Sequence, residues 1–182
     1  MKKILKLSAI LFAVCAIVAG ILGGVNELTK DRIAEITIQK TKAAYSAVLA
    51  SEDYETVEFD AADPTFVHVD KISKCTGGEG YVVEITVSGA QGMITMAVGV
   101  DNDLKCTGIS IIDHSETSGL GANAASTATV GVNFRSQFKG EGKDIAITKA
   151  GGNIDALSGA TITSKACCTA VAEAITAVEA LG

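Results

Sequence analysis

The sequence has no tryptophan and few other aromatic residues, which limits the partners it can bind. Its phenylalanines and tyrosines are scattered and are not interleaved with basic residues, so they form no platform on which single-stranded nucleic acid would stack. The formal net charge of −6 also has the wrong sign for contact with a phosphate backbone. We therefore expect no nucleic-acid partner.

Proline occurs only once, and hydrophobic residues make up 48% of the chain. Such a chain can bury enough apolar surface to offset the entropy lost on folding, which argues against disorder. The 182 residues leave room for a membrane helix and one domain of roughly 100 to 150 residues.

Metal-ligand patterns are also missing, because the five cysteines show no C-x-x-C spacing and there are only two histidines. We expect no metal site. Cys15 lies in an apolar run, and Cys167 and Cys168 lie in a predicted helix, where buried thiols are the ordinary interpretation. A disulfide between Cys75 and Cys106 stays open on sequence alone.

An uncharged and mainly apolar run of 19 residues extends from Leu7 to Val25. A helix of this length, rising about 1.5 Å per residue, is long enough to cross a bilayer core. A cleaved signal peptide has a shorter apolar core, of about 7 to 15 residues, before a small-x-small site. We therefore expect a retained transmembrane helix within residues 1–25. A lipoprotein anchor at Cys15 is disfavoured because Val14 precedes it where a small residue is usual.

Three positive charges, on Lys2, Lys3 and Lys6, precede the apolar run and predict a cytoplasmic N-terminus. The rest of the chain is then expected on the periplasmic or external side of the cell membrane. Residues 26–50 have apolar positions at near-helical spacing among charged residues, so an amphipathic stem helix is predicted there. A pilin is disfavoured, because in pilins the processing site precedes the apolar run, whereas Gly24 lies at its end.

Residues 51–182 alternate β-rich runs with short glycine-containing turns, after a turn signal at Asp63-Pro64. The predicted strands are Phe66–Ile72, Tyr81–Val87, Ile94–Val100 and Cys106–Ile112, with another possible strand at Ile145–Thr148. We expect a loop with short helical pieces over Asp113–Val132 and a packed helix over Ile162–Leu181. The predicted fold class is α+β: a transmembrane helix with its stem, then a small antiparallel-sheet domain with a C-terminal helix packed on it.

A small-residue loop directly precedes this last helix. Gly159 and Ala160 let the backbone approach a ligand closely, and a helix N-terminus offers unpaired amides and partial positive charge to an anion. Thr161 presents a hydroxyl there, and Lys165 follows one turn later as a candidate counter-charge. A phosphate would fit this place. The alternative, and on physical grounds the commoner role of such residues, is that the hydroxyls of Ser158, Thr161, Thr163 and Ser164 only cap the helix.

The segment from Asp155 to Thr161 resembles the flavinylation motif of the FMN-binding domain family, through Asp155, Ser158, Gly159, Ala160 and Thr161. In that family a flavin transferase attaches FMN through its phosphate to the last threonine of the motif. The resemblance implies covalent FMN, as a phosphoester, on Thr161.

An upstream stretch, His114 to Gly121, resembles a second motif of that family, which lies against the bound flavin. The family usually has proline where Ser118 stands, so this loop is expected to be less rigid. An acid and a threonine here are expected to bond polar flavin atoms, two glycines to admit the ring, and a leucine to cover one of its faces. These residues are Glu116, Thr117, Gly119, Leu120 and Gly121. A plain glycine-rich turn is the alternative.

No catalytic residue is expected. His114 has no suitable nucleophile and orienting group in the pattern and is interpreted as structural. Residues 134–140 either form another wall of the site or pack in the core.

The order of anchor, stem, small domain and motif resembles the G subunits of Rnf ferredoxin:NAD oxidoreductases. The C subunits of sodium-pumping NADH:quinone oxidoreductases share the motif but are generally longer. This resemblance implies a redox subunit that transfers electrons through FMN and pumps nothing alone. Its partners would be integral membrane and cytoplasmic subunits of an ion-translocating electron-transport complex, with a flavin transferase for maturation. Two rivals stay open: a membrane-anchored binding module, and a stand-alone surface flavoprotein.

Overall fold

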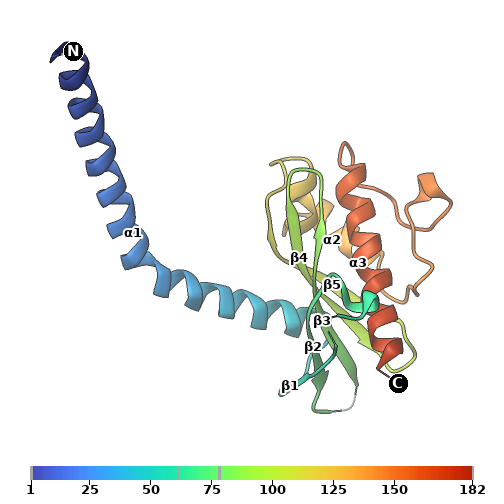
Figure 1. Ribbon diagram of the computed structural model, residues 1–182. Helices are drawn as coiled ribbons and strands as arrows, with labels where there is room; N and C mark the ends of the chain where they lie inside the picture. The colour runs from blue at the N-terminus through green and yellow to red at the C-terminus, as the bar shows by residue number, and fades with distance from the viewer. Residues whose placement is uncertain (1, 61, 78, 182) are drawn as a thin grey trace. The chain divides into compact units, whose positions relative to one another are not determined.

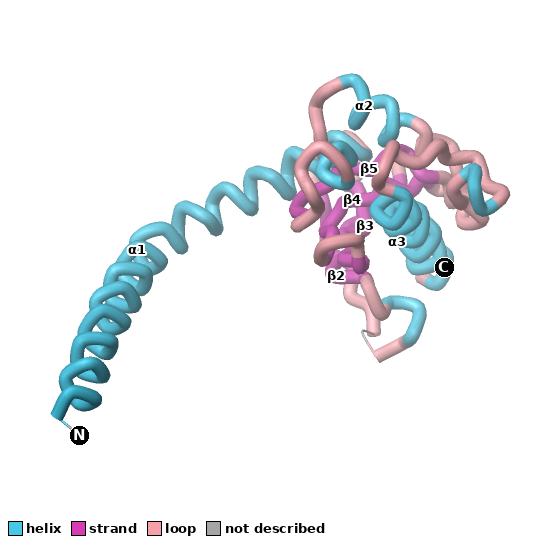
Figure 2. Tube along the Cα trace, turned by 90° about the horizontal axis from the view of Figure 1, so that it is seen from above, coloured by secondary structure: helices cyan, strands magenta, loops and turns pink. Residues whose placement is uncertain are grey.

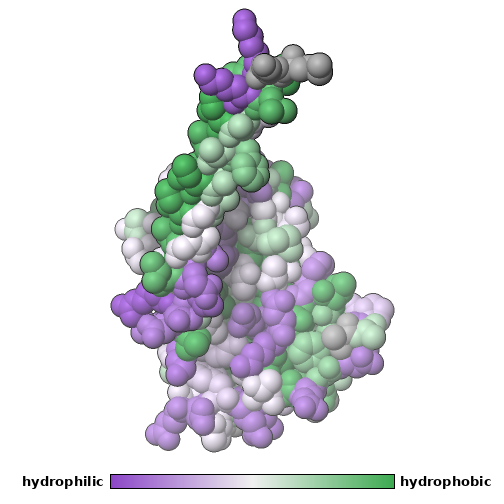
Figure 3. Space-filling view, turned by 60° about the vertical axis from the view of Figure 1, so that its left-hand side comes forward, coloured by the Kyte–Doolittle hydropathy of each residue, from purple (hydrophilic) through white to green (hydrophobic). Residues whose placement is uncertain are grey.

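A computed structural model describes residues 2–60, 62–77 and 79–181, and the chain forms two compact units, one ending at Lys40 and one beginning at Thr41. The first unit lies within helix α1, Lys2–Val48. Apolar side chains from Ile4 to Val25 are exposed along it, and Figure 3 shows hydrophobic surface along this helix. By length and composition the helix can cross a membrane, with a mean hydropathy of 2.5 in its most apolar window.

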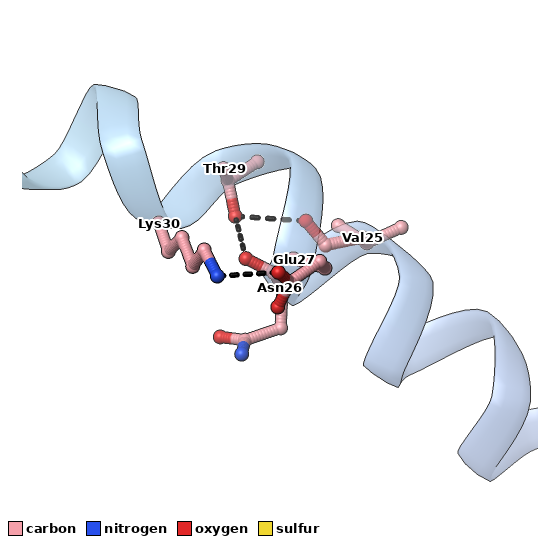
Figure 4. A network of polar contacts seen from close by, with 5 residues as sticks. All are labelled: Val25, Asn26, Glu27, Thr29 and Lys30. Atoms are coloured by element: carbon pink, nitrogen blue, oxygen red, sulfur yellow. Dashed lines mark hydrogen bonds and ion pairs between the residues drawn. The ribbon is translucent and has the colours of Figure 1, made fainter.

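Polar contacts begin where the apolar run ends (Figure 4). The Thr29 hydroxyl donates to the Val25 carbonyl at 2.9 Å and to the Asn26 carbonyl at 3.3 Å. One turn of the helix also carries an ion pair between Lys30 and Glu27. Charged groups that pair in solvent mark the polar boundary of the apolar segment.

The second unit contains a five-stranded antiparallel sheet in the order β1-β2-β3-β4-β5, so each strand pairs with the next one along the chain (Figure 1). The strands are β1 Tyr54–Val57, β2 Val69–Cys75, β3 Gly80–Ser88, β4 Met93–Asp101 and β5 Cys106–His114. The predicted meander is therefore confirmed. Strand β1 was not predicted, because its four residues show no apolar alternation.

Strand β2 begins three residues later than the predicted run from Phe66 to Ile72. The reason is a 3-10 turn, η1 Pro64–Phe66, whose N-cap is Asp63. The Asp63 carboxylate accepts a hydrogen bond from the Thr65 amide at 2.8 Å, and this cap stabilises the turn at the expense of the strand.

The two faces of the sheet carry separate hydrophobic clusters, because successive strand residues point to opposite sides. Helix α3, Thr161–Ala180, lies along one face of the sheet (Figure 2). Val83 and Val98 pack in the cluster on this face. Val82 and Ala97 point to the other face, where they pack against the last turns of α1. The Val48 carbonyl there accepts a hydrogen bond from Thr107 Oγ1 at 2.6 Å. The α+β fold class is confirmed.

The connection from β5 to α3 contains η2 Gly121–Ala125, α2 Thr129–Ser136 and η3 Thr148–Ala150. The predicted loop with helical pieces is thus confirmed. The strand considered at Ile145–Thr148 is wrong: only a single parallel bridge joins Ile147 to Ile154. A 3-10 turn that starts at Thr148 and ends at the left-handed Gly151 leaves no room for a longer ladder.

All five cysteines are free thiols. Cys75 belongs to the cluster under α1, whereas Cys106 belongs to the cluster under α3. Because the two side chains point to opposite faces of the sheet, the disulfide considered between them does not form.

Candidate functional site

Helix α3 begins at Thr161, so the residue expected to carry a cofactor stands at its N-terminus. Thr161 is half-buried, and its neighbour Ile162 is exposed. Ala160 occupies the N-cap position, and in the part of the chain that the structure describes it makes no side-chain cap hydrogen bond. Amides of the first turn therefore stay available to an anion, together with the partial positive charge of the helix end.

The hydroxyls offered as helix caps have other partners. Ser164 Oγ accepts from the Leu157 amide at 3.0 Å and donates to the Ala160 carbonyl at 2.9 Å, so it ties the loop to the helix. Thr163 Oγ1 donates to the carboxylate of Glu116. These two residues therefore do more than cap the helix, because their hydroxyls bond the loop before the helix and Glu116.

The two stretches singled out in the sequence meet in space. Gly159 has a φ of 71°, in the left-handed region, and a Cβ there would lie 2.9 Å from Leu120 Cδ2. The left-handed backbone favours glycine at this position, and the contact brings the tip of Leu120 close to it. A Cβ on Gly121 would lie 2.5 Å from Thr163 Oγ1, so the loop and the helix are in contact at a second point.

The loop before η2 presents its side chains outward. Thr117 and Leu120 are exposed, and the Thr117 carbonyl accepts from the amides of Leu120 and Ala122 at 3.1 and 3.2 Å. Gly119 has a φ of 77° and no atom within 4 Å of a Cβ built on it. The open side of this turn is free to take a ligand.

Glu116 is the only acidic side chain among the buried polar residues of the described chain. Its Oε1 accepts from the amides of Ala90 and Gln91 at 2.8 and 3.0 Å, and its Oε2 accepts from Thr163. Burial raises the pKa of this carboxyl, but the hydrogen bonds from Gln91, Thr163 and Ala90 outweigh it and lower the pKa overall. The carboxylate is therefore ionised and bonded within the protein, a role that the sequence alone did not indicate.

Asp155, Ser158 and Lys165 are exposed beside Thr161. The backbone of Asp155 is held by the side chain of Gln137, whose Oε1 accepts from its amide at 2.8 Å and whose Nε2 donates to its carbonyl at 3.3 Å. Of the two roles considered for residues 134–140, core packing is observed for Phe134, and Gln137 also supports the backbone of the motif.

A cleft of about 440 Å³ lies between α2 and the motif. Its walls come from one face of α2 and from four consecutive residues of the motif loop: Val130, Asn133, Phe134, Gln137, Asp155, Ala156, Leu157 and Ser158. On its α2 side, Arg135 donates to the carbonyls of Ala124 and Ser126 at 2.6 and 2.9 Å and so fixes η2.

The donor set fits a flavin phosphate: a half-buried hydroxyl, amides of an uncapped helix end, a left-handed glycine and an exposed lysine one turn on. The cleft beside the motif has equal numbers of apolar and polar lining residues, and Thr161 is not among them. His114 contacts the same loop: its Nδ1 accepts a hydrogen bond from the Glu116 amide at 3.2 Å.

Comparison with known proteins gives consistent similarities. Residues 89–176 match the FMN-binding domain family, and residues 1–48 match the RnfG N-terminal region. The G subunit of the ion-translocating oxidoreductase complex of Methanosarcina acetivorans is 32% identical, over 98% of this chain and 96% of the relative. The G subunit of the Na(+)-translocating ferredoxin:NAD(+) oxidoreductase complex of Acetobacterium woodii is 33% identical, over 91% of this chain and 86% of the relative.

A solved structure is also similar, that of the C subunit of the Na(+)-translocating NADH-quinone reductase of Parabacteroides distasonis. It is 21% identical, covers 76% of this chain and 80% of its own, and has a TM-score of 0.47. The identity to the two G subunits is higher and extends over more of each chain.

Proposed function

This chain belongs to the G-subunit family of ion-translocating oxidoreductase complexes, and from that membership we propose that it is their electron-transfer subunit, with FMN attached covalently to Thr161. The chain is membrane-anchored through the apolar part of α1. The complex in which it works is an ion-translocating ferredoxin:NAD oxidoreductase, with other subunits as its partners. FMN supplies one- and two-electron transfer, and the polypeptide supplies position and environment.

The position of Thr161 is the observation that carries this proposal. Its hydroxyl stands half-buried at the start of a 20-residue helix that has no side-chain cap at Ala160 among the described residues. A phosphoester oxygen at this place would receive the first-turn amides and the positive end of the helix dipole. The exposed Lys165 lies one turn on and could supply a counter-charge to the phosphate.

Attachment requires an activated phosphate and an enzyme that transfers it. We assign this step to a flavin transferase that uses a flavin dinucleotide. The Thr161 oxygen forms the new P–O bond, the pyrophosphate bond breaks, the mononucleotide AMP leaves, and the hydroxyl proton passes to a base of the transferase. The motif residues Asp155, Ser158, Gly159 and Ala160 form the segment that the transferase would bind.

We propose that the domain faces the periplasmic or external side, since three lysines precede the apolar run. A covalent bond suits that location because free flavin is scarce there and a dissociated cofactor would be lost. Near the attachment point, the exposed Thr117, Gly119 and Leu120 would offer a wall to the ring, whereas Gly121 is buried.

The proposal is tested by producing the full chain with and without a flavin transferase, in cells that make flavin dinucleotide. Intact mass and in-gel fluorescence of the denatured chain are then measured. We expect a fluorescent band only with the transferase, heavier by one FMN minus water. An unmodified chain under both conditions would contradict covalent attachment and favour a membrane-anchored binding module.

A further test separates a subunit from a stand-alone flavoprotein. The flavinylated chain is extracted from its own membranes with a mild detergent and sized. Co-migration with other redox subunits is expected, and a lone yellow chain that reduces an external acceptor would contradict the assignment to a complex.

A further inference from the structure

One buried carboxylate joins three segments that are far apart in the sequence. Glu116 accepts from the amides of Ala90 and Gln91, in the turn between β3 and β4, and from the hydroxyl of Thr163, in the first turn of α3. Its own amide donates to His114 Nδ1 at 3.2 Å. The hairpin turn, the loop and the acceptor helix therefore meet at one side chain.

Two glycines make room for this carboxylate. A Cβ on Gly89 would clash with Glu116 Oε1 and would lie 2.8 Å from Ile94 Cδ1. A Cβ on Gly121 would clash with Oε2 and would lie 3.0 Å from Glu116 Cβ. Each carboxylate oxygen thus lies against a glycine, at a place where no side chain would fit.

The charge state sets the direction of each hydrogen bond. An ionised carboxylate only accepts, so Thr163 must donate its proton to it, and the hydroxyl rotor is fixed. Thr163 lies two residues after Thr161, within one helical turn. Rotation or sliding of that turn would break the bond, so the bond restrains the backbone that carries Thr161.

Beyond its first turn, α3 is tied to other segments by the pairs of Glu173 with His68 and of Glu179 with Lys143, whose glutamates lie 12 and 18 residues after Thr161 and are partly solvent-exposed. Its buried face consists of alanine, valine, isoleucine and cysteine packed on the sheet, and such packing is non-directional. Aliphatic contacts hold the helix against the sheet, whereas a hydrogen bond with a preferred angle fixes its rotation about its axis.

We propose that Glu116 is a positioning residue for flavin attachment: it holds the first turn of α3 so that the Thr161 hydroxyl faces the incoming phosphate. This inference rests on the proposed function. It differs from the role implied by family resemblance, in which Glu116 bonds polar atoms of the flavin, because both of its oxygens already have protein partners.

Transferase kinetics test the proposal, with the full chain in detergent as acceptor and with FAD as donor. For Glu116→Ala we expect kcat to fall about 10- to 100-fold, since a misplaced nucleophile loses rate steeply, while KM for the acceptor stays within about twofold because the exposed motif is intact. Thr163→Val should reproduce this loss in kcat. The double variant should be no worse than the poorer single one, as expected for two ends of one interaction.

Glu116→Gln supplies the conservative rescue. The carboxamide oxygen can accept from the two hairpin amides, and its NH₂ can donate to the Thr163 oxygen, so most of kcat should return. Glu173→Ala is the matched control. Glu173 Oε2 pairs with His68 Nδ1 at 2.7 Å farther along α3, so this variant also breaks a tie of the helix but leaves the acceptor turn untouched. Its kcat should equal that of the wild type.

Thermal unfolding is recorded for every variant, and rates are compared below all transitions. The inference is overturned if Glu116→Ala and Thr163→Val attach flavin with the wild-type kcat, or if Glu173→Ala slows attachment equally. A changed flavin spectrum in Glu116→Ala, with Thr163→Val unchanged in rate and spectrum, would instead assign Glu116 to the flavin. Failure of the wild type itself to accept flavin would contradict the proposed function, a result distinct from all of these.

Discussion

The first turn of α3 and the body of the same helix are built on different principles. The body buries an aliphatic stripe that includes Ala170, Val171, Ala174 and Ile175, and solvent-exposed ion pairs line its other side. The first turn buries two hydroxyls, Thr163 and Ser164, each with hydrogen-bond partners outside the turn.

This difference separates stability from placement. The body gains free energy from apolar area removed from water, a contribution that depends little on angle. The first turn buries polar groups that must be hydrogen-bonded. It starts after Ala160, which gives it no side-chain cap among the described residues, and Gly159 before that has a left-handed backbone. Departures of this kind from ordinary helix ends are expected where a protein performs its function.

The largest effect is expected at the hydroxyl itself. Thr161→Val removes the oxygen with little change in volume, so covalent flavin should disappear completely while the unfolding temperature stays near that of the wild type. Thr161→Ser keeps the hydroxyl and should retain attachment. In-gel fluorescence and intact mass check both variants, and retained flavin in the valine variant would move the attachment site elsewhere.

A change in the body should do the opposite. Ile175 is 1% exposed, and Ile175→Ala should lower the free energy of unfolding by about 2 to 5 kcal/mol through the cavity it leaves. Flavin attached per folded molecule should stay the same. Denaturant unfolding and flavin-to-protein absorbance ratios measure the two quantities, and a parallel loss of flavin would show that the two regions are not separable.

Gly159→Ala should affect both quantities. A left-handed alanine costs roughly 1 to 2 kcal/mol, and its Cβ would also push against Leu120. We expect slower flavin attachment and a lower unfolding temperature. Gly77→Ala is the control, because its Cβ would meet only Glu79 Cγ, at an ordinary 3.8 Å. Equal behaviour of the two variants would contradict the contact between the two motifs.

The smallest effect is a pH dependence. The pKa of Glu116 is lower in the folded chain than its ordinary value of 4.5, so its carboxylate stabilises the fold above that pH. The contribution is lost as the pH falls below 4.5 through the lower folded pKa. Over this pH window, the free energy of unfolding should change more steeply with pH for the wild type than for Glu116→Gln, which carries no titrating group at this position. Identical slopes would mean that the buried carboxyl is not ionised.

Much of this arrangement could be predicted from the sequence, because it is local. Alternating runs with short turns specify a meander. The small residues before the last helical pattern indicate either a phosphate site or a helix cap, and Thr161 is singled out by resemblance to the flavinylation motif. Strand β1 was not found, since Tyr54–Val57 lacks an apolar alternation. A strand was expected near Ile147, where only a bridge forms, because a turn begins at the next residue.

Partners across long sequence separations could not be predicted. Glu116 bonds residues 26 positions before it and 47 positions after it, and Gln137 holds the backbone of Asp155 from 18 positions away. Periodicity reports which face a residue occupies, but not which loop faces it from another element. The sequence therefore placed Glu116 at the flavin, whereas the structure gives it hydrogen bonds to the hairpin and to α3.

The account depends most directly on where the flavin is joined to the chain. The measurement that tests it is fragmentation of the flavin-containing peptide, after the chain is purified from its own membranes, denatured and digested. The account predicts one flavin peptide, spanning residues 150–165, with FMN minus water localised on Thr161. Flavin that separates from the chain on denaturation, or that is localised on a different residue, would contradict it.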